Sequence, residues 1–518
     1  MRSLARFVAR TSGLRLSACI TLGFVAVFTE TAAGQLRVAE WNVTNYTNGR
    51  VAEFQTAIYG VFEGRSMAPD IVIGQEFINQ TGLTIFLSIL NTAPGSPADW
   101  AVAPFVNGPD TDNAFFYRTS KVDFLGVTTV AVGGFSPNHP RNIERYDVRL
   151  KNYTSDGAVL ACYSSHMKAG SSGTDQSRRL LEAQRIRDDA ESLNADWQFL
   201  LGGDFNIQTS SQAAYIEMIG PQANNDGRFT DPIRRAGSWN NNSSFEVIHT
   251  QDPAGAGGMD DRHDQILVEF SLVDGVGFDY IGNPIAYDLS TWDDPNHSYR
   301  SWGNDGTSYN TTLTVTGNDM VGATIAQALI DSALTGGHLP VFLDLRVPAK
   351  ISSDAVIDFG MVGQGDLAQQ TLTVTNNGDT ALWTAAGIAD LVYSMSTTAG
   401  FTAPGGSFAE PAGGGSDMHV IEMDTSTAGV KNGTLTILSD APDQPSLVVS
   451  VTGEVVPSCD PFDANCDMVV DTNDVTPFAN LLLGLSSPCD SCTGDGSGNA
   501  IVDADDIQSF VDRLINGP

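Results

Sequence analysis

Seven polar residues stand at the ends of short apolar segments between residues 42 and 338, and their side chains are of the types that bind metal ions or move protons. Carboxylate and amide oxygens bind hard divalent cations, and histidine changes its protonation near neutral pH. Metal-assisted acid–base chemistry is therefore expected if the seven side chains meet. Asn42, Glu76, His166, Asp204 and Asn206 close their segments, whereas Asp264 and His338 open theirs.

Antiparallel strand pairing would bring these residues together. A strand that ends in a polar residue and an antiparallel neighbour that begins with one place both residues at the same sheet edge. Asp204 and Asn206 are two positions apart, so their side chains point the same way on an extended chain. Gly202 and Gly203 precede them in WQFLLGGDFN and allow backbone or substrate to approach closely. The pattern predicts one site.

The elements that must position this site form a mixed α/β domain over residues 35–350. Short apolar segments alternate there with helical patterns such as DQSRRLLEAQRIRDDAESL, as is typical of α/β folds. The helical patterns stop at RVPAKISSDA, which indicates a domain boundary. Cys162 lies inside an apolar segment and is expected to be a buried thiol.

The ordered set WN, QE, SSH, GDFN, RHD and GHLP, spread over about 310 residues, resembles the endonuclease/exonuclease/phosphatase superfamily. The resemblance implies a four-layer α/β sandwich, in which two packed mixed sheets are flanked by helices. It also implies hydrolysis of phosphate esters with Mg²⁺ or Mn²⁺. By the same resemblance, Asn42 and Glu76 would bind the catalytic ion, and His338 paired with Asp264 would act as base or proton relay on the attacking water.

The resemblance assigns further roles around the phosphate. Asp204 and Asn206 would orient the nucleophile, with proton transfer to Asp204 left open, and His166 would donate a hydrogen bond to the phosphoryl or leaving oxygen. Tyr117 and Arg141 are candidate phosphate contacts.

One position departs from the family pattern. The family usually has a metal-binding Asp directly before the final His, and this chain has Gly337. The missing carboxylate could weaken metal binding, remove a second metal position, or be replaced by Asp260 or Asp261.

Residues 1–34 have the pattern of a secretory signal peptide. Arg2, Arg6 and Arg10 precede the apolar segment CITLGFVAVF, and small residues follow up to Gly34, where cleavage is expected. No later segment has the length of apolar sequence that a membrane span needs. We therefore expect a secreted protein, extracellular or associated with the cell surface.

Residues 353–456 are expected to form an antiparallel β-sandwich. Alternating segments such as QTLTVTN and SLVVSVTGEVV are separated by turn-forming stretches. The segment IDFGMVGQGDLAQQTLTVTNNGDTAL resembles immunoglobulin-like repeats of bacterial surface proteins.

Residues 457–518 contain two acidic loops, each followed by a helical pattern, and resemble a dockerin-like EF-hand pair. Oxygen ligands at loop positions 1, 3, 5, 9 and 12 wrap a cation of calcium size. Met468 and Ala500 replace the usual loop glycine, and the last ligand is Asp instead of Glu, so structural Ca²⁺ is expected instead of a sensor role. The predicted ligands are Asp463, Asn465, Asp467, Asp471 and Asp474 in the first loop, and Asp495, Ser497, Asn499, Asp503 and Asp506 in the second.

The other cysteines gather in this last segment. In an exported chain, Cys459, Cys466, Cys489 and Cys492 are expected to form two disulfides of undetermined pairing.

The chain is strongly acidic, with a formal net charge of −34. Such a field repels polyphosphates at long range, so a polyanionic substrate must be held by local cations and metal. The arginines of segment 173–190 are expected on a solvated, ion-paired helix face, which is also the densest basic region. His139, His249, His263 and His297 are expected at solvated loop positions.

The leading hypothesis is a secreted Mg²⁺-dependent phosphodiesterase that hydrolyses DNA or RNA. The alternatives are a sphingomyelinase-like phospholipase C or a phosphomonoesterase, and a surface-binding protein without catalysis. A cell-surface or cohesin-like partner is a further expectation for the C-terminal segment.

Overall fold

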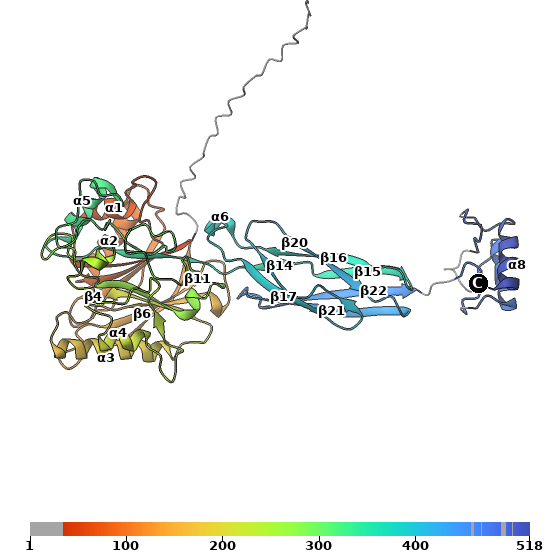
Figure 1. Ribbon diagram of the computed structural model, residues 1–518, viewed down its shortest axis with the longest axis horizontal. Helices are drawn as coiled ribbons and strands as arrows, with labels where there is room; N and C mark the ends of the chain where they lie inside the picture. The colour runs from red at the N-terminus through yellow and green to blue at the C-terminus, as the bar shows by residue number, and fades with distance from the viewer. Residues whose placement is uncertain (1–34, 457–459, 468, 488–493, 500, 518) are drawn as a thin grey trace, which may run out of the picture.

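The computed structural model describes residues 35–456, 460–467, 469–487, 494–499 and 501–517. Three units follow one another along the chain (Figure 1). The predicted signal peptide, Cys459, Cys489, Cys492 and the two departures at Met468 and Ala500 lie outside the described residues.

The first unit contains two β-sheets, one of seven strands and one of six. The seven-stranded sheet contains β1 (Leu36–Tyr46), β2 (Ile71–Phe77), β3 (Trp100–Val102), β4 (Asp112–Arg118), β11 (Asp279–Tyr280), β12 (Arg300–Ser301) and β13 (Val341–Arg346). The six-stranded sheet contains β5 (Val122–Ala131), β6 (Ile143–Leu150), β7 (Val159–Ser164), β8 (Gln198–Asp204), β9 (Phe229–Thr230) and β10 (Asp264–Glu269).

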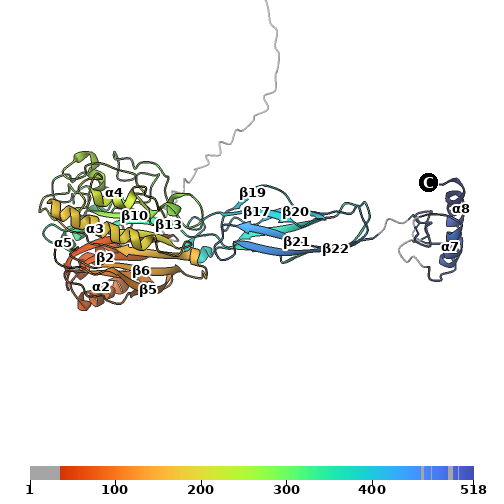
Figure 2. The same ribbon diagram turned by 90° about the horizontal axis from the view of Figure 1, so that it is seen from below.

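Helices cover the outer faces of both sheets (Figure 2). The seven-stranded sheet carries α1 (Val51–Tyr59), α2 (Gln80–Thr92) and α5 (Gly322–Ala333), and the six-stranded sheet carries α3 (Gly173–Ala190) and α4 (Ala213–Ile219). Short 3₁₀ turns lie at η1 (Asp156–Ala158), η2 (Ser243–Ile248) and η3 (Phe270–Val273).

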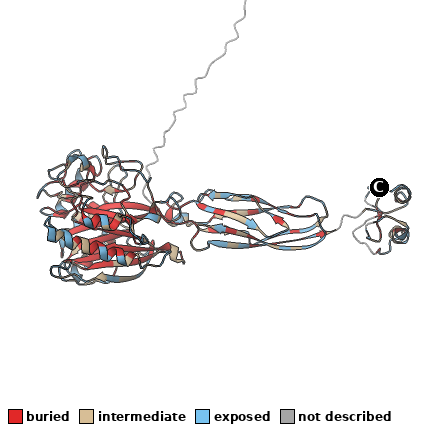
Figure 3. Cartoon of the chain, turned by 60° about the horizontal axis from the view of Figure 1, so that its bottom comes forward, coloured by how far each residue is buried: buried red, intermediate tan, exposed pale blue. Residues whose placement is uncertain are grey.

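Apolar side chains from the two sheets pack against each other. Val38 and Ile73 of one sheet share a fully buried core with Leu200 and Ile266 of the other. Buried positions accordingly concentrate on the strands between the helical layers (Figure 3). The mixed α/β fold is confirmed, and its layers are helix, sheet, sheet and helix.

The register of the strands explains how polar residues meet at one edge. β1 is antiparallel to β13, with Glu40 opposite Val341, and β8 is antiparallel to β10, with Asp204 opposite Asp264. The carboxyl ends of β1 and β8 therefore lie beside the amino ends of β13 and β10, as the sequence predicts.

The second unit consists of two sheets around their own apolar core. One sheet contains β14 (Ile351–Ser353), β16 (Gln369–Asn376), β18 (Phe401–Thr402) and β20 (Asp417–Met423), and the other contains β15 (Val356–Gly363), β17 (Leu391–Thr397), β19 (Ser407–Glu410), β21 (Gly429–Ser439) and β22 (Ser446–Val456). β15 pairs with β22 in parallel, so the predicted all-antiparallel pattern is wrong for this pair. Its immunoglobulin-like character stays a prediction.

The first two units are joined by a packed interface. Trp383 at the end of α6 (Thr380–Trp383) is fully buried and belongs to the core between the first unit's sheets. Asp443 accepts hydrogen bonds from the backbone N–H groups of Thr154 and Ser155, each at 2.9 Å. The second unit is thus anchored at the sheet end away from the polar edge.

The third unit contains η4 (Thr472–Asp474), α7 (Val475–Leu482) and α8 (Asp506–Asn516), which confirms the two predicted helical patterns. Phe462, Phe478 and Phe510 form its small core. Cys466 is disulfide-bonded, and Cys162 in the first unit is free and buried, as predicted. None of the described helices combines the length and apolar character of a membrane span.

Two expectations about charged residues are wrong. Arg179 and Arg187 on α3 are buried instead of solvated, because they donate to the loop carbonyls of Gly170 and Gly220. The four histidines that were expected in solvated loops, His139, His249, His263 and His297, are all buried. His139 and His249 bond backbone carbonyls, whereas His263 bonds the Gln251 side chain and His297 bonds the Tyr280 hydroxyl.

A buried ion pair fixes the entry to β10. Both terminal nitrogens of Arg262 bond the Asp231 carboxylate, at 2.9 and 3.0 Å, with side-chain exposures of 0% and 5%. Asp231→Ala would leave the guanidinium buried without a partner, so the free energy of unfolding should fall by about 3–5 kcal/mol in urea denaturation. Glu63→Ala, which removes the exposed partner of Arg65, is the control and should cost less than about 1 kcal/mol. Equal losses would contradict the prediction.

Candidate active site

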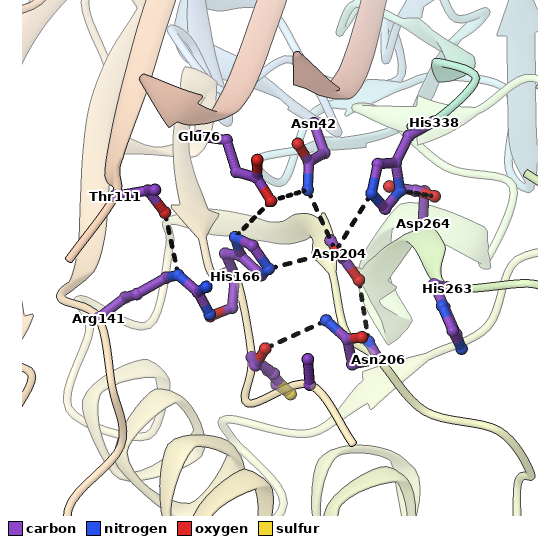
Figure 4. A network of polar contacts seen from close by, with 12 residues as sticks. Asn42, Glu76, Thr111, Arg141, His166, Asp204, Asn206, His263, Asp264 and His338 are labelled. Carbon is purple, nitrogen blue, oxygen red and sulfur yellow. Dashed lines mark hydrogen bonds and ion pairs between the residues drawn. The ribbon is translucent and has the colours of Figure 1, made fainter. Parts of the chain in front are cut away.

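The structure brings all seven strand-end residues to one edge of the two sheets (Figure 4). Asn42 at the end of the regular part of β1 connects the sheets, because its Nδ2 donates to Glu76 Oε1 and to Asp204 Oδ2, each at 3.1 Å. Its Oδ1 accepts from the Thr44 backbone N–H at 3.0 Å. An N–H donor thus lies between two carboxylates.

Glu76 points into the site because β2 is irregular there. Its φ of 62° lies in the left-handed region, and the pairing with β4 shifts register between Gly74 and Phe77. A side chain in this conformation is held at some cost in backbone strain. The result is that Gln75 reaches Ser164 between the sheets, whereas Glu76 Oε2 accepts from the Asn45 N–H at 2.9 Å.

His338 and Asp264 form a hydrogen-bonded pair. Nδ1 of His338 lies 2.9 Å from Asp264 Oδ2, which also accepts from Thr250 Oγ1 at 2.6 Å. Nε2 lies 3.7 Å from Asp204 Oδ2. Burial alone would lower the pKa of His338, but the carboxylates of Asp264 and Asp204 outweigh it and raise the pKa to about 10. The imidazolium is therefore the form present at neutral pH.

His166 has the opposite electrostatic character. Nε2 lies 3.3 Å from Asp204 Oδ2 and Nδ1 lies 3.7 Å from Glu76 Oε1, yet burial dominates and lowers the pKa of His166 well below its usual value. The nearby charges of Arg141 and His338 add to this lowering. His166 is a neutral imidazole with one N–H to donate.

Asp204 stands at the centre of the polar edge. Its Oδ1 accepts from the Asn206 backbone N–H at 3.1 Å, while Asn206 Nδ2 donates to the carbonyl of Met167 at 3.2 Å. Burial raises the pKa of Asp204, and His338 opposes this rise. The carboxylate is thus held in place by backbone and faces both histidines.

The two phosphate-contact candidates have different outcomes. Arg141 lies at the site, with Nε donating to Thr111 Oγ1 at 3.0 Å and Nη1 to the carbonyl of His166 at 3.5 Å. Tyr117 pairs with Ile71, at the opposite end of β2 from Glu76, and stacks on Phe124. The prediction for Tyr117 is wrong because β4 runs antiparallel to β2 and carries this residue away from the site.

Glu40 is a site neighbour that sequence analysis missed. It lies two residues before Asn42 on the same strand face, is fully buried, and neither carboxyl oxygen has a hydrogen-bond partner among the described residues. Burial, with Asp264 and Asp204 nearby, raises its pKa well above the usual value. A Cβ at Gly202 would lie 3.2 Å from the Glu40 side chain, so this glycine makes room for it. The polar residue inside the apolar VAEWN was the available signal.

Gly337 cannot be replaced by an aspartate without local change. Its φ is 76°, and a Cβ there would lie 2.3 Å from the Ala333 carbonyl oxygen. Asp252 Oδ1 lies 3.4 Å from where a Cβ of Gly336 would be. Burial raises the pKa of Asp252 to about 6, and His338 is the cation that opposes this rise. Asp252 thus places a carboxylate beside Gly336, and replacement of the missing carboxylate by Asp260 or Asp261 stays a prediction.

The donor set fits a hard divalent cation. Within the described part of the chain, ligand atoms of Asp204, Asp264 and His338 lie within 4.8 Å of one another. Asp264 Oδ1 is buried and accepts no hydrogen bond there. The Glu76 carboxylate lies on the other side of Asp204, and the Asn42 amide nitrogen bonds both carboxylates. Several oxygen ligands next to an unpartnered carboxylate oxygen are what magnesium-type sites offer.

The comparisons with known proteins give structural likeness at low identity. The chain matches no protein-family model and no curated protein. Three solved structures with likeness to it are humanized D. rerio TDP2 (13% identity, 60% of this chain and 99% of that chain, TM-score 0.35), the human Nocturnin catalytic domain (12%, 60% and 94%, 0.33) and an endonuclease/exonuclease/phosphatase from Beutenbergia cavernae (12%, 80% and 100%, 0.32).

The raised pKa of His338 predicts how stability depends on pH. Folding raises this pKa from 6.5 to about 10, so the imidazolium stabilises the metal-free fold fully below pH 6.5 and the contribution disappears as pH rises through about 10. His338→Gln should therefore destabilise most at low pH, on the order of 1.4 kcal/mol for each unit of pKa shift, as measured by urea denaturation in chelator.

His419→Gln in the second unit is the matched control. Burial lowers the pKa of His419, so the fold keeps this imidazole neutral at a pH where the unfolded chain would protonate it, which costs stability at low pH. This cost diminishes as pH rises, so the effect of the substitution should depend on pH in the direction opposite to that of His338→Gln. A pH-independent effect of His338→Gln would contradict the assigned ionisation.

Proposed function

We propose that the protein is a secreted, divalent-metal-dependent phosphodiesterase that hydrolyses nucleic acid. The observation that supports this most is the meeting of Glu76, Asp204 and His338 at one buried edge, with a neutral histidine beside a protonated one. Phosphodiester hydrolysis needs this combination of anionic metal ligands, proton acceptor and cationic donor.

Asn42 and Glu76 would hold the Mg²⁺ or Mn²⁺ ion. The Asn42 carboxamide lies between two carboxylates, and turning its oxygen toward them would complete an all-oxygen set. When bound, the ion neutralises charge that develops on the phosphoryl and leaving oxygens.

Four side chains are assigned the proton transfer and the stabilisation of the phosphate charge. Asp204, fixed by the Asn206 N–H, accepts the proton of the attacking water. His338, held protonated by Asp264, donates a hydrogen bond to the phosphoryl oxygen instead of acting as the base. Neutral His166 donates its N–H toward the leaving oxygen, and Arg141 adds positive charge. Fixed donors in a site shielded from bulk water stabilise the charge that develops.

The third unit is proposed to bind two Ca²⁺ ions. Its two loops repeat the same internal bonds: Asp474 accepts from the N–H groups of Asn465 and Asp471, each at 2.9 Å, and Asp506 accepts from those of Ser497 and Asp503, each at 2.8 Å. The last carboxylate of each loop is therefore held by backbone N–H groups of its own loop, in the same way in both repeats. A cell-surface or cohesin-like partner for this unit stays a proposal.

Glu76→Ala and His338→Ala test the catalytic assignment. Each removes a group that contacts the reacting phosphate or its metal, so cleavage of DNA or RNA in Mg²⁺ should fall by at least about 10²-fold, measured by product formation on gels. Glu422→Ala on the exposed surface of β20 is the control and should keep full activity. Full cleavage by both site variants would contradict the proposal, and an inactive wild type would favour the non-catalytic alternative.

Calcium binding is predicted for the third unit. Titration calorimetry of the full chain should show Ca²⁺ binding that the double variant Asp474→Ala/Asp506→Ala loses, because each substitution removes the last predicted carboxylate ligand of one loop. Asp512→Ala, on α8 outside the loops, is the matched control. Binding heat unchanged in the double variant would contradict the loop assignment.

A further inference from the structure

The loop of residues 132–142 connects β5 to β6 at the edge that carries the site. β6 pairs with β7 so that Glu144 lies opposite Ser164, and His166 follows two residues later. Arg141, at the end of the loop, donates to the His166 carbonyl at 3.5 Å. Whatever this loop contacts therefore lies next to the reacting groups.

The loop is held in one shape by hydrogen bonds. Gly134 N–H donates to the carbonyl of His139 at 2.7 Å, and Asn138 N–H donates to that of Phe135 at 2.9 Å. Arg178 on α3 donates to the carbonyls of Gly134 and Asn138. These contacts hold the backbone on both sides of Phe135.

Phe135 points into solvent. Its exposed fraction of 97% is the highest of any large hydrophobic side chain in the described part of the chain, and neighbouring Val132 is 66% exposed. An exposed phenyl ring gains nothing from the burial that stabilises a fold. Single exposed apolar residues are ordinary, but here an ordered loop holds an aromatic ring beside a site proposed to act on phosphodiesters.

Arginine side chains lie near the loop that carries Phe135. Arg178 contacts the loop directly. Arg185 is exposed about two turns later on α3. Burial lowers the pKa of His139 in the loop, and the nearby charges of Arg185 and Arg178 lower it further. Arg141, which also pairs with Asp110 at 3.4 Å, adds a third arginine to this region of an acidic protein. A polyanion with aromatic groups complements such a surface.

We propose that Phe135 stacks on an unpaired base of a single-stranded nucleic acid whose backbone follows Arg141, Arg178 and Arg185 into the site. This inference rests on the proposed function, because it names the form of nucleic acid that the site takes. Stacking on an aromatic ring accepts every base but needs one outside a duplex. The protein should therefore prefer single strands or frayed ends to intact duplex.

The test measures binding in the Glu76→Ala background, where turnover is blocked. Fluorescence anisotropy of a short fluorescein-labelled single-stranded DNA should show that Phe135→Ala weakens binding by about ten-fold, the size of one base stack. Phe135→Trp should retain binding, and Phe135→Leu should not, because it keeps apolar area without a π face. Leu367→Ala, 78% exposed in the second unit, is the control.

An abasic strand of the same length separates stacking from other effects. Phe135→Ala should leave the affinity for this strand unchanged, because no base is present to stack. Equal affinity of wild-type and Phe135→Ala proteins for the normal strand would overturn the proposal. The proposal would also be overturned if Phe135→Ala lost binding to phosphatidylserine vesicles and kept its DNA affinity, because the loop would then be a membrane contact. If the wild type cleaved no nucleic acid, the proposed function would be overturned instead. The two failures are distinguishable, because the binding assay is read without turnover.

Discussion

Burying several carboxyl groups side by side is the constraint on which this site depends. Glu40, Asp204 and Asp264 are each no more than 2% exposed, and their mutual repulsion in a region of low dielectric must be relieved. Three features do so: His338 is held as an imidazolium, burial raises the pKa of Glu40 and thus favours its neutral form, and Asn42 places an N–H between two carboxylates. A divalent cation would relieve the same repulsion more fully, which is why this arrangement favours metal binding.

The two sheets supply the rigidity that such a cluster needs. Above the apolar core, a polar layer links the sheets, because Gln75 Nε2 donates to Ser164 Oγ at 3.2 Å and that hydroxyl donates to Asn113 Oδ1 at 3.0 Å. Below this layer the sheets pack through fully buried aliphatic side chains. Each functional side chain therefore projects from a strand end that is packed on both faces of its sheet. The second unit is anchored at the opposite end of the sheets from the site.

The overall charge and the local charge of the protein act in opposite directions. A net charge of −34 disfavours nonspecific attraction of polyanions. Residues 349–518 contribute to this strongly, since Lys350, Lys431 and Arg513 are their only basic residues. Near the site, however, Arg141 ends an ordered loop and Arg178 donates a hydrogen bond to that loop. Selection of substrate would then depend on short-range contacts, such as ring stacking and metal–phosphate bonds, more than on long-range attraction.

Local sequence was sufficient to predict the elements and the seven strand-end residues, because strand periodicity and the polar residue that ends each segment are both short-range features. It also predicted the helical repeats of the third unit and the buried Cys162. Tertiary structure decided what depends on direction and neighbours. Tyr117 lies at the far end because β4 reverses the chain, and His263 and Arg179 are buried because distant loops cover them. The raised pKa values of His338 and Glu40 also belong to this second group, since they follow from burial and from carboxylates that only strand pairing brings within reach.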